Sequence, residues 1–160
     1  MTRKPVAEGN KAPDFELTAT GGKSIRLSEL RGRPVVVYFY PKDNTPGCTA
    51  EGQDFRDLYP RFRRRRTVIF GISRDTLKMH ENFKAKHKFP FQLLSDPDEV
   101  ACKRYDVIKM KNMYGRKVRG IERSTFLIDP EGVVRRVWRK VRVPEHATEV
   151  LAAVADLSKA

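Results

Sequence analysis

The chain contains two cysteines, and one of them follows a loop that is typical of a reactive site. Cys48 lies in the stretch YFYPKDNTPGCT, residues 38–49. Pro46 and Gly47 end the extended segment and predict that a helix begins there, so Cys48 should lie in its first turn. Free backbone N–H groups and the positive end of the helix dipole favour an anion at that position. A thiolate is such an anion, and it is the attacking form of cysteine. The sequence therefore predicts a nucleophile at Cys48.

A helix terminus alone is too weak to ionise a thiol at neutral pH. A free cysteine has a pKa near 8.5, and lowering that value by about 2.5 requires about 3.4 kcal/mol. The terminus supplies about 0.3–1 kcal/mol when exposed and about 2 kcal/mol when partly buried. We therefore expect a hydrogen-bond donor and a fixed cation nearby, with Thr45 and an arginine as candidates. The Thr45 hydroxyl either caps a backbone N–H, which is the commoner role, or orients a hydroxyl-bearing substrate.

Strand and helix patterns alternate around this cysteine. The run PVVVYFY, residues 34–40, is continuous, β-branched and aromatic, as in a strand buried on both faces. Apolar side chains then recur at helical spacing from Gly47 to about Phe62. Sites in open α/β sheets lie where a strand passes into the next helix, and Cys48 has that position.

The remaining elements follow from the same patterns. We expect a hairpin around Gly21-Gly22 within 15–30 and strands at 67–73, 91–96, 124–129 and 133–141. We expect helices at 75–88, with Asp75 as N-cap, at 96–105, beginning with Asp96-Pro97, and at 144–160. The connections should include a turn at Pro130-Glu131-Gly132 and a loop at 109–113. This order predicts a single α/β domain over residues 1–160, with a mixed central sheet flanked by helices and an N-terminal β-hairpin.

The composition is that of a globular protein with an unusual positive charge. Apolar residues make up 39% and charged residues 33%, and the formal net charge is +13, concentrated at 61–66 and 135–142. These runs either bind nucleic acid or an anionic membrane, or form a solvated face, and without zinc-finger or RNA-binding signatures we favour the solvated face. No apolar run approaches the roughly 18 residues of a membrane span. The N-terminal segment has no apolar region of a secretory signal, and two cysteines form no disulfide framework, so we expect a cytoplasmic protein.

The pattern Pro41-x-x-x-Thr45-x-x-Cys48 resembles the active-site signature of peroxiredoxins, which are thiol peroxidases with a thioredoxin-like fold. The longer string YFYPKDNTPGCT is similar to the bacterioferritin-comigratory, or peroxiredoxin Q, branch. The resemblance extends through APDFEL, SDPDEVACKRYDV and GIERSTFLIDPEG, and so covers nearly the whole chain. The signature is highly specific, unlike a lone cysteine.

The resemblance implies a role for each matched residue. Cys48 would be the peroxidatic cysteine, which attacks the peroxide O–O bond and becomes a sulfenic acid. Thr45 would hydrogen-bond the peroxide and the thiolate, and Pro41 would shield the pocket. The distant arginine of the family falls on Arg123, in GIERSTF, where its donors would stabilise the thiolate and polarise the peroxide. The substrates would be hydrogen peroxide and organic hydroperoxides, and no metal, haem or flavin cofactor is implied.

This chain departs from the family in its second cysteine. Many members of the branch carry a resolving cysteine five residues after the peroxidatic one, where this chain has Gln53. The other usual position, in the following helix, holds Asn82, Phe83 and Lys84. Only Cys102 remains, and its apolar neighbours favour a buried, non-resolving thiol, although resolution by Cys102 after local unfolding stays open. We therefore expect a one-cysteine cycle with an external thiol: thioredoxin, glutaredoxin or a small thiol. We expect a monomer or a weak homodimer.

Three other functions fit the residues less well. A thioredoxin-like disulfide oxidoreductase needs a Cys-x-x-Cys motif, and here Glu51 occupies the position of the second cysteine. A nucleic-acid-associated protein would use the arginine runs. A metal site is disfavoured because His80, His87 and His146 show no ligand spacing, and we expect them to be exposed helix residues.

Overall fold

The computed structural model describes residues 6–157, and seven of its strands form one sheet in the order β2-β1-β5-β4-β3-β8-β9. These strands are β1 (Glu16–Ala19), β2 (Lys23–Arg26), β3 (Val35–Phe39), β4 (Val68–Ser73), β5 (Gln92–Ser95), β8 (Ser124–Ile128) and β9 (Val134–Trp138). The pairs β3–β4 and β4–β5 are parallel, and the other pairs are antiparallel. The mixed central sheet and the N-terminal hairpin are therefore confirmed.

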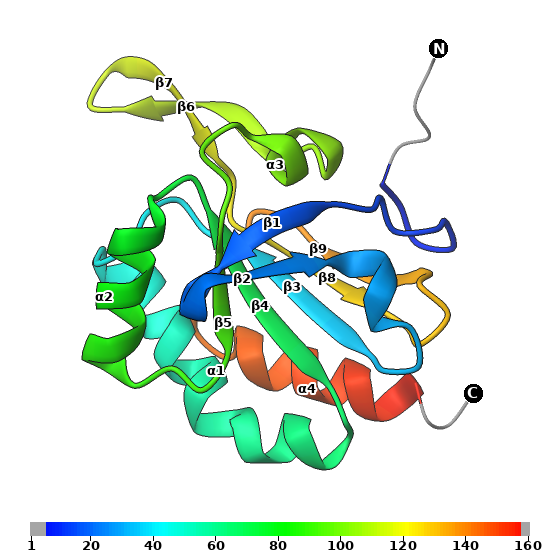
Figure 1. The fold of residues 1–160 in the computed structure, drawn as a ribbon. Coiled ribbons are helices and arrows are strands. Elements are labelled where there is room, and N and C mark those ends of the chain that lie inside the picture. The colour runs from blue at the N-terminus through cyan, green and yellow to red at the C-terminus, as the bar shows by residue number, and fades with distance from the viewer. Residues whose placement is uncertain (1–5, 158–160) are drawn as a thin grey trace.

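Helices cover both faces of this sheet (Figure 1). They are α1 (Pro46–Arg64), α2 (Leu77–His87), α3 (Val100–Arg104) and α4 (His146–Leu157), with short 3₁₀ turns at Thr20–Gly22 and Leu27–Leu30. Side chains of α1, α2 and α4 pack with one set of strand residues, while α3 and the segment around β1 pack with the other. Within residues 6–157, no helix is both long and apolar enough to cross a bilayer.

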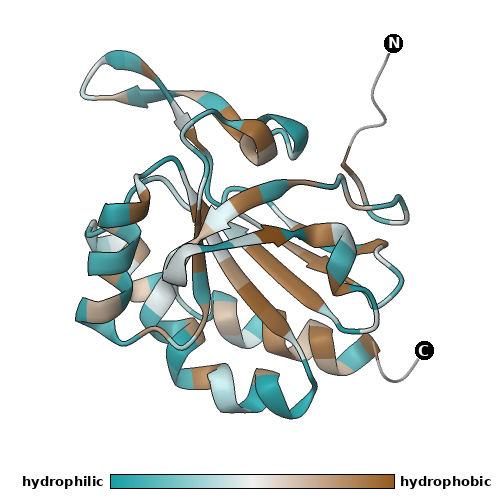
Figure 2. Ribbon diagram, viewed as in Figure 1, coloured by the Kyte–Doolittle hydropathy of each residue, from teal (hydrophilic) through white to brown (hydrophobic). Residues whose placement is uncertain are grey.

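The buried strand β3 separates two hydrophobic cores. Alternate residues of a strand point to opposite faces, so Val35, Val37 and Phe39 contact the core that contains α3, here called the α3 core. Val36 and Tyr38 contact the core that contains α1, α2 and α4, here called the α1 core. Figure 2 shows the central strands as a hydrophobic layer between helices that carry polar residues on their outer sides.

Two helix starts differ from those expected. Thr76, not Asp75, caps α2, since its Oγ1 accepts a hydrogen bond from the backbone N–H of Met79 at 3.2 Å. The third helix begins at Val100 rather than at Asp96, although the Asp96 carboxylate does accept from the Val100 N–H at 2.7 Å. A carboxylate can thus satisfy the free N–H groups of a helix that begins four residues later. The last helix begins at His146, and positions 158–160 of the predicted helix lie outside the described residues.

The prediction of a loop at 109–113 is wrong, because these residues form a strand. Residues of β6 (Ile108–Met113) and β7 (Arg116–Ile121) pair in an antiparallel hairpin. Tyr114 and Gly115 form its turn with positive φ values of 53° and 79°, as a type I′ hairpin turn requires. The hairpin projects from the body of the protein beside α3 (Figure 1).

Candidate active site

Cys48 lies in the first turn of α1, directly after the loop that leaves β3. The helix begins with Pro46 at its first position, so the predicted helix start is confirmed. The first turn carries no acidic side chain that would compete for its free N–H groups. Cys48 is buried at 2% exposure and packs in the α1 core. The sulfur thus lies at the positive end of a helix in a poorly solvated position.

Arg123 reaches this sulfur because β8 runs antiparallel to β3. Phe39, the last residue of β3, pairs with Ser124, the first residue of β8. The residue before β8 therefore lies beside the loop that follows β3. Arg123 Nη2 donates a hydrogen bond to Cys48 Sγ at 3.3 Å. The structure thus brings a permanent cation to the helix terminus that carries the thiol.

Glu51 is the second partner of Arg123. In the sequence it is notable only because it occupies the position of the second cysteine in a Cys-x-x-Cys motif. Its Oε1 accepts from Arg123 Nη1 at 2.6 Å, while its Oε2 is buried with no hydrogen-bond partner within the described part of the chain. Burial raises the pKa of Glu51 to about 7, and the charge of Arg123 opposes that rise. Glu51 follows Cys48 by three residues, a spacing that puts both on one helix face and could have identified it.

Arg123 therefore bridges the sulfur and a buried carboxyl group. Burial disfavours its positive charge, but the charges of Glu51 and Cys48 outweigh burial and raise the pKa of Arg123. A planar guanidinium binds two groups at once through separate N–H donors. The site therefore holds a fixed, oriented cation where negative charge would develop, which is the arrangement that stabilises anionic transition states.

Gly47 leaves room for this contact. A Cβ atom at Gly47 would lie 3.1 Å from Arg123 Nη2, closer than a side-chain contact normally allows. The residue before the cysteine therefore sets how closely the guanidinium approaches the helix terminus.

Thr45 and Pro41 occupy the loop before α1. Thr45 is the N-cap residue, but its side chain makes no capping hydrogen bond, and its hydroxyl instead donates to the Lys42 carbonyl at 2.8 Å. The expected capping role is therefore wrong. The hydroxyl oxygen still has lone pairs to accept with, so orientation of a substrate by Thr45 stays a prediction. Pro41 is partly buried in the same loop, and its shielding role also stays a prediction.

The exposed position expected for His146 is wrong, because this side chain is buried next to Arg123. It is 4% exposed, and its Nε2 lies 2.8 Å from Thr125 Oγ1. Burial, assisted by the charge of Arg123, lowers the pKa of His146 to about 4. At neutral pH the imidazole is therefore neutral and adds no second positive charge beside Arg123. His87 is partly exposed.

The exposed position expected for His80 is also wrong. His80 is fully buried, with Nδ1 2.7 Å from Asp43 Oδ2 and Nε2 3.0 Å from the Leu94 carbonyl oxygen. Because that carbonyl only accepts, Nε2 carries a proton. The Tyr40 hydroxyl donates to Asp43 Oδ1 at 2.6 Å, and the Asp43 N–H donates to Asp75 Oδ2 at 2.9 Å. This network fixes the loop that leads from β3 to Cys48.

The same network contains the described residues best suited to hold a metal ion. Asp43, Asp75 and His80 place carboxylate and imidazole atoms within 4.8 Å of one another. Their polar atoms already bind one another and the backbone, and these hydrogen bonds account for the cluster without an ion.

Cys102 is separated from Cys48 by the sheet. Both cysteines are free, but Cys102 packs in the α3 core, whereas Cys48 packs in the α1 core. Cys102 is fully buried, and burial raises its pKa well above that of a free thiol. An inert, protonated thiol is expected in such a position.

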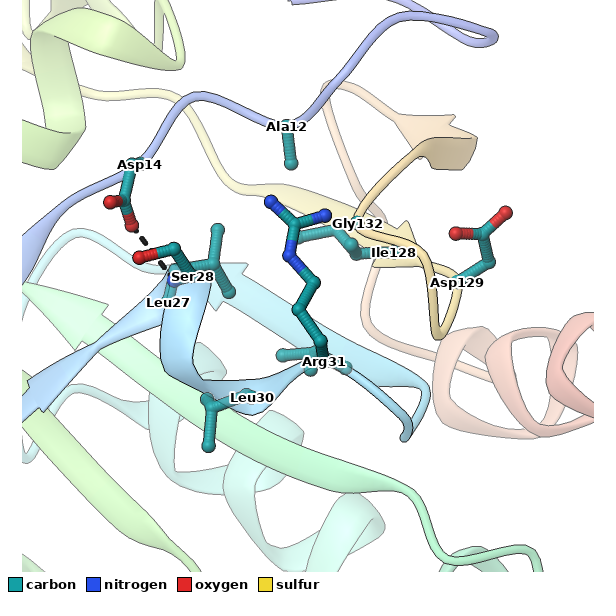
Figure 3. Close-up of a pocket in the computed structure, with 10 residues that line it drawn as sticks. Ala12, Asp14, Leu27, Ser28, Leu30, Arg31, Ile128, Asp129 and Gly132 are labelled. Atoms are coloured by element: carbon teal, nitrogen blue, oxygen red, sulfur yellow. Dashed lines mark hydrogen bonds between the residues drawn. The ribbon is translucent and has the colours of Figure 1, made fainter.

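Two other features lie away from the candidate site. The arginines of the run 61–66 lie at the C-terminal end of α1, the opposite end of the helix from Cys48. A cavity of about 10 Å³ lies between the N-terminal segment, Arg31 and Gly132, next to Asp14, which accepts from the Ser28 N–H at 2.9 Å (Figure 3). This cavity holds at most one water molecule, so neither feature contributes to the chemistry at Cys48.

Comparison with known proteins identifies relatives along nearly the whole chain. The model of the AhpC/TSA family matches residues 8–137. Peroxiredoxin Bcp of Xanthomonas campestris pv. campestris is 55% identical over 146 residues, which cover 91% of this chain and 91% of that protein.

Solved structures agree with this chain in fold as well. The bacterioferritin comigratory protein of Xanthomonas campestris, studied for its alkyl peroxide reduction activity, gives a TM-score of 0.89 at 49% identity, covering 95% of this chain and 99% of that one. A cysteine-to-serine variant of PrxQ from Xylella fastidiosa gives a TM-score of 0.91 at 42% identity, covering 98% of this chain and 99% of that one.

Proposed function

Since this chain belongs to the AhpC/TSA family, in its Bcp or peroxiredoxin Q branch, and is a thiol-dependent peroxidase, we propose that Cys48 is its peroxidatic cysteine. The observation that carries the proposal is the 3.3 Å contact between Arg123 Nη2 and Cys48 Sγ at the start of α1. The substrates are hydrogen peroxide and organic hydroperoxides. The alkyl peroxide reduction activity of the related Xanthomonas protein supports the organic substrates.

The first half of the reaction consumes the peroxide. The Cys48 thiolate attacks the terminal, hydroxyl-bearing oxygen of ROOH, so an S–O bond forms while the O–O bond breaks. The sulfur is oxidised to a sulfenic acid, and the departing alkoxide takes up a proton to give the alcohol. The Arg123 donors stabilise the negative charge as it moves from sulfur to oxygen. Thr45 orients the peroxide, and Pro41 limits the access of water.

The second half uses an external thiol in a one-cysteine cycle. A thiol R′SH attacks the sulfenic acid, releases water and leaves a mixed disulfide on Cys48. A second thiol then breaks that disulfide, which regenerates the Cys48 thiolate and forms R′–S–S–R′. The position of Cys102 in the opposite core supports this cycle, because a disulfide needs Cα atoms within about 7 Å. Thioredoxin, glutaredoxin and small thiols all supply the required sulfur.

The proposed compartment is the cytoplasm. Both cysteines are free, which fits a reducing environment. The family implies no metal, haem or flavin, and the reaction above needs none.

Single-turnover oxidation of two cysteine variants tests the proposal. We expect Cys48→Ser to abolish peroxide consumption, and Cys102→Ser to leave the rate of the first turnover unchanged. Mass spectrometry of the peroxide-treated protein should find a sulfenic or overoxidised adduct on Cys48. A loss of two hydrogens instead would identify an internal Cys48–Cys102 disulfide, and equal loss of activity in both variants would overturn the one-cysteine cycle.

A further inference from the structure

The β6–β7 hairpin carries most of the exposed apolar surface of the described chain. The large hydrophobic side chains exposed within residues 6–157 are Val100, Met110, Met113, Tyr114 and Val118, at 36%, 61%, 48%, 100% and 41%. All but the first belong to the hairpin, and Val100 begins the neighbouring helix α3. Hydrophobic and hydrophilic residues alternate along the hairpin (Figure 2). Single exposed apolar residues are normal, but their concentration on one projecting element indicates an interaction surface.

The hairpin is also strongly basic. Residues 108–121 contain five basic residues and no acidic one. Arg119 pairs with Glu99, and Lys109 pairs with Asp106 at 3.1 Å. The other three, Lys111, Arg116 and Lys117, have no carboxylate within 4.0 Å among the residues the structure describes. A partner that covers these residues must therefore bring negative charge.

One face of the hairpin begins near the candidate active site. Cross-strand partners share a face, as do residues two apart on a strand, so Lys111, Met113, Arg116 and Val118 lie together. The Lys111 ammonium donates to the Ile121 carbonyl and is close enough to Cys48 and Arg123 to interact with their charges. Strand β7 also ends two residues before Arg123. The Lys111 end of this face is therefore near the candidate site, and Met113 and Arg116 continue the face toward the hairpin turn.

We propose that this face, Lys111, Met113, Arg116 and Val118 together with the turn residue Tyr114, is the docking surface for an acidic protein dithiol that reduces oxidised Cys48. The inference rests on the proposed function. A second copy of this chain is a poor partner, because its net charge is also +13 and its hairpin is equally basic. A small thiol is too small to contact an apolar, basic surface of this extent.

A single dithiol partner can replace the two external thiols of this cycle, and the electrons still balance. One partner thiol attacks the Cys48 sulfenic acid, water leaves, and a mixed disulfide joins the two proteins. The second partner thiol attacks its own disulfide-bonded sulfur and releases the Cys48 thiolate. The partner leaves as an intramolecular disulfide, having supplied the two electrons that the peroxide consumed. A weak, transient interface is sufficient for such a reductant.

The test compares a protein reductant with a small one. The probes are a thioredoxin selected for negative net charge and dithiothreitol, and the measured quantity is the ratio of the turnover rates that they support. We expect the Arg116→Glu variant, whose substituted residue lies on this face, to lower this ratio several-fold at low salt, and high salt to remove the difference. Arg63→Glu is the control, because it changes the net charge equally at the far end of α1 and should leave the ratio unchanged.

A second hairpin variant isolates the apolar contribution. We expect Met113→Ser/Val118→Ser to lower the ratio several-fold without changing its salt dependence. Equal ratios in the wild type and both hairpin variants would overturn the docking proposal, as would an equal fall in the α1 control. Loss of binding to a single-stranded oligonucleotide, with an unchanged ratio, would assign the hairpin to nucleic acid instead. If peroxide fails to oxidise Cys48 of the wild type in a single turnover, the proposed function itself fails.

Discussion

Arg123 Nη2 lies 3.3 Å from Cys48 Sγ, although 75 residues separate them in the sequence. The antiparallel pairing of β8 with β3 produces this contact, because it places the start of one strand beside the end of the other. The same guanidinium binds Glu51, so its orientation is fixed on two sides. The pairing of β3 with β8 therefore places a cation beside the helix terminus that carries Cys48.

Replacement of Arg123 by lysine tests the orientation of this cation. Lysine keeps the positive charge but cannot bind the sulfur and the Glu51 carboxylate through one planar group. We expect Arg123→Lys to lower the second-order rate of peroxide reduction by about 10²–10³-fold, as for the loss of one preorganised donor. Stopped-flow oxidation measures this rate, and Arg63→Lys on the exposed end of α1 is the control. A rate within twofold of the wild type would show that charge alone is sufficient.

Gly47→Ala tests how closely the arginine must approach. Alanine has the higher helix propensity, by about 0.8–1 kcal/mol, so α1 should not be weakened. Its Cβ would lie 3.1 Å from Arg123 Nη2 and push the guanidinium away by a few tenths of an ångström. We expect the oxidation rate to fall about tenfold while the melting temperature is unchanged or higher. Gly120→Ala is the matched control, because its Cβ would meet nothing closer than 3.8 Å. Equal rates in both variants would contradict this account.

Local patterns in the sequence predicted most of the fold and the position of Cys48 in the first turn of a helix. The apolar run 34–40 and the Pro46-Gly47 signal depend only on neighbouring residues, and the structure has β3 and α1 there. Arg123 could be assigned to the site only from the family resemblance, because no local sequence pattern shows that the strand after it pairs with β3.

Three residues of the site region were missed or misplaced for long-range reasons. The helical positions of His80 and His146 fit exposed residues equally well, and their burial depends on Leu94 and Thr125, which belong to other elements. The spacing of Glu51 from Cys48 indicates a shared helix face, but its ion pair with Arg123 depends on the loop between β7 and β8, which the spacing does not show. The hairpin was missed although its alternating pattern and Tyr114-Gly115 turn are hairpin signals.

Glu51 should make stability fall as the pH rises. Its pKa is raised from 4.5 to about 7 by burial, so folding is favoured by the protonated form. That contribution is fully present below about pH 4.5 and is lost through pH 7, for a total of about 3 kcal/mol. We expect Glu51→Gln to gain about that much stability relative to the wild type between pH 4.5 and 8 in urea unfolding. Glu149→Gln, at an exposed position of α4, should show no such gain, and a pH-independent difference for Glu51→Gln would contradict the raised pKa.

His146 should act in the opposite direction over nearly the same pH range. Its pKa is lowered from 6.5 to about 4, so the buried imidazole favours folding when neutral, and this contribution is lost as the pH falls from 6.5 through 4. The two contributions of about 3 kcal/mol therefore cancel between about pH 4.5 and 6.5, and the wild-type unfolding free energy should be nearly flat there. We expect His146→Gln to become more stable on acidification and Glu51→Gln less stable, while the double variant is flat. If the wild-type and His146→Gln curves run parallel from pH 7 to 4, the imidazole is not held neutral by its burial beside Arg123.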